Sequence, residues 1–161
     1  MGNVMVKTQL EQVEKFLKEV TENLNNFLDE HTIGQMKEED VDHRYAKSIF
    51  RSLRRLTVYC EEGLEECQII LKNSSFRKAA AEKTLYVIYH QCIEEFYQPK
   101  NDIWFEDPRS AYTGKNAIKF RDKAPNLIVN LLTSLENEFQ TIREELEYYE
   151  TDYRTKITQS K

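Results

Sequence analysis

The sequence predicts an all-α protein, a four-helix up-and-down bundle with one long connection between its third and fourth helices. The 161 residues include only four Gly and three Pro, which leaves little material for the turns of an all-β protein. Apolar residues recur at alternating spacings of three and four towards both ends of the chain, as in amphipathic helices. This length suits one core, so residues 1–161 are expected to form a single helical domain.

The first helix is predicted from about Val6 to Phe27. Its apolar positions follow a heptad spacing with polar residues between them, and they are Val6, Leu10, Val13, Leu17, Val20, Leu24 and Phe27. Such a seam commits one face of the helix to a partner. The polar segment 31–42 contains Gly34 and is predicted to connect this helix to the next.

The second helix is predicted to begin near Asp40 or Asp42, which would cap it, and to run to Lys72. Gly63 is expected to interrupt it. Its polar face is basic in the first half and acidic in the second half. This order opposes the helix dipole and therefore indicates pairing with a neighbouring helix.

The third helix is predicted from a cap near Ser75 to about Gln98, because Pro99 cannot continue it. The link between the second and third helices is short, so the two are expected to be antiparallel. That arrangement places Glu94 and Glu95 beside the bases of the second helix. Pairs of this kind select register more than they stabilise the fold.

The connection from Pro99 to about Gly114 exceeds the usual length between bundle helices, so it is a candidate functional loop. Its aromatic residues favour an ordered structure. The fourth helix is expected to restart near Thr113 or Asn116. Pro125 should then either begin a long helix at its first turn or kink a continuous one. A second seam predicts that this helix exceeds about 45 Å and continues to Tyr153.

The composition of the chain argues against several classes of function. A net charge of −5 and a pI of about 5.4 argue against general binding to nucleic acid. Cys60, Cys67 and Cys92 form no CxxC pair and are expected to be reduced core residues. Residues 1–7 do not resemble a secretory signal, and no apolar run approaches the ~20 residues of a membrane span. We therefore expect a cytoplasmic protein that does not bind membranes.

The segment 99–119 is the candidate site. Backbone N–H groups at a helix start, with nearby cations, can bind an anion such as a phosphate or an acidic segment of a partner. Ordinary helix capping, with the bases paired to neighbouring acids, is the alternative. The candidate ligand or partner residues are Trp104, Arg109, Tyr112, Thr113, Lys115 and Lys119.

An enzymatic alternative rests on Glu61, Glu62 and Glu65. This EExxE string resembles the first half of the magnesium motif of all-α nucleoside-triphosphate pyrophosphatases of the MazG type. The second half is missing, and a helical wheel places these carboxylates on the solvent side. Glu94 or Glu95 would have to complete the site.

His90 and Glu94 share a helix face and would begin a metal site, but no ExxH pair accompanies them. A hydrogen-bonded surface histidine is the preferred interpretation. Cys92 is two residues from His90, so the two side chains diverge and form no nucleophile pair. The sequence therefore predicts no metal and no cofactor.

Three stretches, FRKAAAEKTLYVIYHQCIEEF, PKNDIWFEDPRSAYTGKNAIKF and REELEYYETDYRTKI, resemble an uncharacterised family of bacilli, the YpuI-like proteins. The resemblance runs along the whole chain. It implies a small cytosolic bacterial protein and carries no activity, cofactor or catalytic residue.

Non-enzymatic binding or regulation is the function we prefer, with an unidentified protein or a small anionic ligand as the partner. The alternatives are the metal-dependent nucleotide hydrolase and a structural homodimer joined by the two seams.

Overall fold

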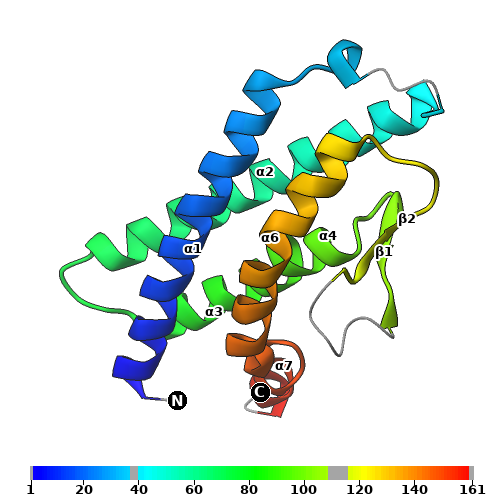
Figure 1. Cartoon of the computed structure of the whole chain (residues 1–161). Helices are drawn as coiled ribbons and strands as arrows, with labels where there is room; N and C mark the ends of the chain where they lie inside the picture. Colours follow the sequence, from blue (N-terminus) through cyan, green and yellow to red (C-terminus); the bar gives the residue numbers. More distant parts are fainter. Residues whose placement is uncertain (1, 37–39, 109–115, 160–161) are drawn as a thin grey trace.

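The computed structural model describes residues 2–36, 40–108 and 116–159, and this part of the chain is mostly helical with one small two-stranded sheet (Figure 1). The all-α class is therefore confirmed in outline. The sheet is an addition that the helical periodicity did not predict. None of the helices described combines the length and apolar character needed to cross a bilayer.

Helices α1 (Asn3–Glu30) and α2 (His43–Lys72) are the longest elements and pack against each other. The predicted seam of α1 is buried at every position from Val6 to Leu24. A short 3-10 turn, η1 (Ile33–Met36), lies in the connection. Asp42 caps α2 as expected, because its carboxylate accepts the backbone N–H of Arg44 at 2.8 Å.

Gly63 does not interrupt α2, which is a correction to the sequence interpretation. The helix continues through it, and Gly63 is buried. A methyl group at this position would lie 3.0 Å from Ile88 Cγ1 and 3.2 Å from Leu17 Cδ1. The glycine therefore marks the close approach of the second and third helical segments beside α1.

Helix α3 (Lys78–Ile88), a π-helical turn η2 (Tyr89–Ile93) and α4 (Glu94–Tyr97) follow one another without a break. Together they correspond to the predicted third helix. The N-cap is Arg77, two residues later than the cap expected near Ser75, and no side chain caps the helix. The π-helical turn carries one extra residue per turn and is common at functional sites.

The segment after Pro99 forms an antiparallel hairpin of β1 (Trp104–Glu106) and β2 (Ile118–Phe120). The expected helix start at Asn116 is therefore wrong, whereas the alternative start at Thr113 lies outside the described residues. Lys119 lies on a strand, opposite Phe105. Asn116 has a φ of 55°, a left-handed conformation that Asn tolerates better than most residues and that is unsuited to a helix start.

The last helical segment is broken, whereas the sequence predicted one long helix. Helix α6 (Asn126–Glu145) begins directly after Pro125, one of the two outcomes expected for that proline. A 3-10 turn, η3 (Glu147–Tyr149), and helix α7 (Asp152–Gln159) follow. The seam positions Leu146, Tyr149 and Tyr153 are still buried, so the apolar spacing predicted burial and missed the break.

The core lies between α1, α2, the α3–α4 rod and α6, and the hairpin covers one end of it (Figure 1). Phe96 of α4 stacks on Phe139 of α6, with ring centroids 3.8 Å apart. All three cysteines are buried and free, as expected. The apolar seams of α1 and α6 are thus buried inside one chain, and the structural homodimer stays a prediction.

Candidate ligand-binding pocket

Trp104 is a core residue and not a ligand-facing one, which corrects its place among the candidates. Its side chain is completely buried, and its Nε1–H donates a hydrogen bond of 2.7 Å to the carbonyl oxygen of Phe96. An indole needs this partner when it leaves water. Trp104 therefore anchors the hairpin to α4 and offers no surface to a ligand.

Lys119 is the other candidate that the structure describes. The remaining four, Arg109, Tyr112, Thr113 and Lys115, lie outside the described residues. Lys119 is exposed and lines a cavity of about 340 Å³ that contains Glu136. The Glu136 carboxylate accepts the backbone N–H groups of Asn116 at 2.9 Å and Ala117 at 2.6 Å. Glu136 thus holds the backbone just before β2 in place. Its negative charge disfavours an anion beside Lys119.

Glu61, Glu62 and Glu65 are all exposed on α2. Of the two acids proposed to complete the site, Glu95 is 3% exposed and is held by the backbone N–H of Lys100 and by Arg55. The Arg55–Glu95 contact of 3.4 Å confirms the predicted pairing of the second and third helices. Across the described residues, no three His, Cys, Asp or Glu side chains are grouped to hold a metal ion.

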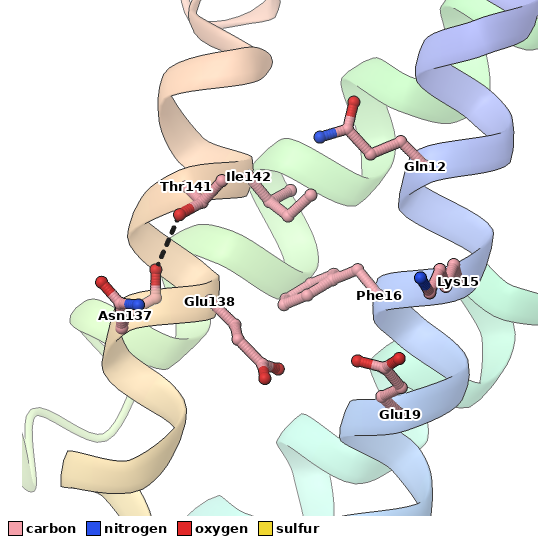
Figure 2. A pocket seen from close by; sticks show the side chains of 8 residues that line it. All are labelled: Gln12, Lys15, Phe16, Glu19, Asn137, Glu138, Thr141 and Ile142. Carbon is pink, nitrogen blue, oxygen red and sulfur yellow. Dashed lines mark hydrogen bonds between the residues drawn. The ribbon is translucent and has the colours of Figure 1, made fainter.

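A groove between α1 and α6 is shown in Figure 2. Its cavity of about 210 Å³ has Phe16 and Ile142 as its apolar part. Glu19 and Glu138 approach the gap from opposite helices, so like charges face each other there (Figure 2). The groove offers no convergent set of polar groups and is best explained by imperfect helix packing.

The largest of these three cavities lies where the π-helical turn, α4, β1 and α6 meet. Its volume is about 390 Å³, within the range typical of small-molecule sites. We call it the Tyr89–Arg143 pocket. It is lined by Tyr89, Ile93, Glu94, Tyr97, Gln98, Glu106, Arg143 and Glu150.

Arg143 is held in this pocket by an acidic and an aromatic neighbour. Its Nη1 and Nη2 atoms donate to the Glu106 carboxylate of β1 at 3.0 and 2.7 Å. Its guanidinium carbon lies 3.7 Å from the ring centre of Tyr97. Burial opposes the charge, but the hydrogen bonds and charge of Glu106 more than offset it, so the pKa of Arg143 is raised. The guanidinium therefore stays charged and fixed against one wall.

Tyr97 and Tyr89 form the aromatic walls, and both are almost fully buried. The Tyr97 hydroxyl donates to Gln140 Oε1 at 3.2 Å. The hydroxyl of Tyr89 has no hydrogen-bond partner among the residues that the structure describes. Burial, followed by the charge of Glu150, raises the pKa of Tyr89 to about 12. Tyr89 is thus a neutral hydroxyl in the pocket wall that is free to bind a guest.

His90 flanks the pocket through Glu94. Its Nδ1 lies 2.9 Å from Glu94 Oε1, which agrees with the predicted hydrogen-bonded surface histidine. Its Nε2 is buried and has no partner within the described part of the chain. The imidazole therefore holds one rim carboxylate of the pocket in place.

The sequence did not single out Tyr89, Glu106 or Arg143. Tyr89 and Arg143 are more than fifty positions apart, and the hairpin that brings Glu106 between them was not foreseen. A usable signal was the spacing of Tyr89, Ile93 and Tyr97, which puts two tyrosines on one helical face.

Residues 10–155 match the family model described as a protein of unknown function (DUF3907). The chain is also 40% identical over 151 residues to the uncharacterized protein YpuI of Bacillus subtilis (strain 168). That alignment covers 93% of this chain and 84% of the relative. The resemblance to the YpuI-like family is confirmed. No solved structure gives a significant match.

Proposed function

The chain belongs to the DUF3907 family of proteins of unknown function, and we propose that it is a non-enzymatic binding protein whose ligand occupies the Tyr89–Arg143 pocket. The observation that carries this proposal is the Tyr89 hydroxyl. A residue that is only 4% exposed keeps a hydroxyl without a partner in the described structure, at the wall of a cavity. The hydroxyl oxygen is not among the buried polar atoms that lack a partner, so it is open to the cavity, where a guest atom can form a hydrogen bond with it.

Binding is favoured over catalysis by how the other groups are paired. Glu106 is held by Arg143 and Glu94 by His90, so neither carboxylate is free to act as a general base, and the third carboxylate, that of Glu150, lies exposed at the rim, where water reaches it. Arg143 stacks on the ring of Tyr97 and donates two hydrogen bonds to Glu106, so it forms a rigid part of the pocket wall. A rigid, partly apolar cavity with a few fixed polar groups is typical of a recognition site.

The scaffold, cellular compartment and oligomeric state that we propose follow from the fold. We infer an up-and-down four-helix arrangement of α1, α2, α3–α4 and α6 as its scaffold, and the buried free cysteines favour a cytoplasmic setting. A homodimer would need a surface other than the buried seams. Light scattering tests it, because a strict monomer at high concentration excludes the homodimer.

The proposal is tested by thermal unfolding with a panel of anionic, cationic and neutral small molecules. At a concentration of 100 Kd, a ligand should raise the Tm by roughly 5–10 °C. The increase should disappear in Gln98→Trp, which fills the pocket from an exposed position on its rim. Gln12→Trp, which changes the α1–α6 groove, is the matched control. If no compound raises the Tm, or if Gln98→Trp responds like the wild type, the proposal fails.

The hydrolase alternative is tested separately with magnesium or manganese and nucleoside triphosphates. We expect no release of pyrophosphate. Turnover that Glu62→Gln abolishes would replace the binding proposal with the enzymatic one.

A further inference from the structure

The Tyr89–Arg143 pocket has an excess of negative charge. It contains the carboxylates of Glu94, Glu106 and Glu150 but one guanidinium, that of Arg143. The forked ion pair neutralises Glu106. Glu150 has no ion-pair partner within the described residues. The field in the pocket therefore attracts positive charge.

The hydrogen-bonding groups of the pocket also favour a positively charged ligand. The Tyr89 hydroxyl has no described partner, and the lone pairs of a hydroxyl can accept an N–H. Glu94 and Glu150 lie at the exposed rim, where a carboxylate can meet a charged group without a large desolvation cost. Tyr89 and Glu150 line the same cavity. One ligand nitrogen can therefore interact with both residues.

An anion and a bare metal ion fit less well. An anion at Arg143 would have to displace Glu106, which already receives two hydrogen bonds, and would enter the field of two further carboxylates. A metal ion needs several ligands close together, and the described residues offer no such group. The cavity of about 390 Å³ instead has room for an organic chain beside its two tyrosines.

We propose that the ligand of this pocket is a small organic cation, whose ammonium group lies between the Tyr89 hydroxyl and the Glu150 carboxylate. This inference rests on the proposed binding function. The alkyl portion of the cation packs against Ile93 and the ring of Tyr89, and the paired side chains of Arg143 and Glu106 form a fixed part of the same lining.

Isothermal titration calorimetry with spermidine as the cationic probe, and with inorganic phosphate and glutamate as anionic probes, tests this proposal at low and moderate salt. Spermidine should bind, and salt should weaken the binding. Glu150→Gln should lose about five- to tenfold in affinity, because one charge partner is removed. Tyr89→Phe should lose a similar factor, because the hydroxyl is removed and the ring is kept.

Two controls separate this site from general attraction to an acidic protein. Glu22→Gln removes an exposed charge from α1, and Tyr148→Phe removes a hydroxyl outside the pocket. Both should bind spermidine as the wild type does. Equal losses in Glu22→Gln and Glu150→Gln would overturn the proposal.

The outcomes also distinguish the ligand class from the binding function itself. If phosphate or glutamate binds in a manner that Gln98→Trp abolishes, while spermidine does not bind, the cation assignment is wrong and the pocket is still a binding site. If no probe and no member of the wider panel binds, both proposals fall.

Discussion

The Arg143 guanidinium of α6 and the Glu106 carboxylate of β1 form a two-pronged ion pair, with N–O distances of 3.0 and 2.7 Å, that ties the hairpin to the helical core. Both side chains are 20% exposed, so water screens the pair only in part. Such a planar, bidentate geometry is available to Arg and not to Lys.

We therefore expect Arg143→Lys to lower the free energy of unfolding by about 1–2 kcal/mol, because it keeps the charge but loses the fork. A double-mutant cycle with Glu106→Gln, measured by urea unfolding, should give a coupling energy of about 1–3 kcal/mol. Additive effects of the two substitutions would show that the pair does not hold the hairpin.

Trp104 should report its burial directly, because it is the single tryptophan of the chain. Its complete burial predicts blue-shifted fluorescence and little quenching by iodide in the native protein. Both properties should change on unfolding in urea. Strong iodide quenching of the folded protein would show that Trp104 is exposed to solvent and would contradict its burial.

Tyr89 should make the protein sensitive to alkali. Its pKa is raised to about 12, from 10 for the free side chain, so the folded state binds more protons than the unfolded state between pH 10 and 12. Unfolding free energy must then fall as pH rises through this window, by up to ~1.4 kcal/mol per pH unit for this group. Tyr89→Phe should lose stability less steeply than the wild type. Parallel curves would show that Tyr89 is not held as a neutral hydroxyl.

Glu95 should contribute a pH dependence in the acid range. Burial raises the pKa of this carboxyl above 4.5, against the opposing effects of the Lys100 N–H and of Arg55. The folded state therefore holds the proton more tightly, and the contribution of Glu95 to stability declines as pH rises from 4.5 to the folded pKa.

The difference in unfolding free energy between Glu95→Gln and the wild type isolates this contribution from that of the other carboxylates. It should shift in favour of the glutamine variant as pH rises from 4 to 7 in a series of urea titrations. A difference that is constant with pH, or that moves the other way, would contradict the raised pKa.

Much of the helical framework could be predicted, because burial follows from apolar spacing. The α1 seam from Val6 to Leu24, the Asp42 cap and the Arg55–Glu95 pairing all depend on residues close in sequence or on adjacent helices. The hairpin could not be predicted, since three-residue strands give almost no periodic signal. The break after Glu145 was missed because the seam spacing continues through it.

The candidate site was less predictable than the fold. Aromatic and basic residues of the 99–119 segment indicated an exposed recognition loop, but Trp104 is needed to fill the core. The pocket itself joins Tyr89, Glu106 and Arg143 from three separate elements, and only the tertiary structure brings them together. The π-helical turn is a local distortion of the helix, and the strand pairing is a contact between separate segments. Residue spacing encodes neither of them.

The most direct test of the account is the NMR spectrum of the protein with labelled tyrosine rings, recorded during a titration with spermidine. Assignment can come from single Tyr→Phe variants. The ring signals of Tyr89 and Tyr97 should shift saturably, while that of Tyr45, whose hydroxyl is bound to the carbonyl oxygen of Ile103 at 2.6 Å outside the pocket, should stay in place. Unchanged Tyr89 and Tyr97 signals, or equal shifts of all three, would contradict a cation site in the Tyr89–Arg143 pocket.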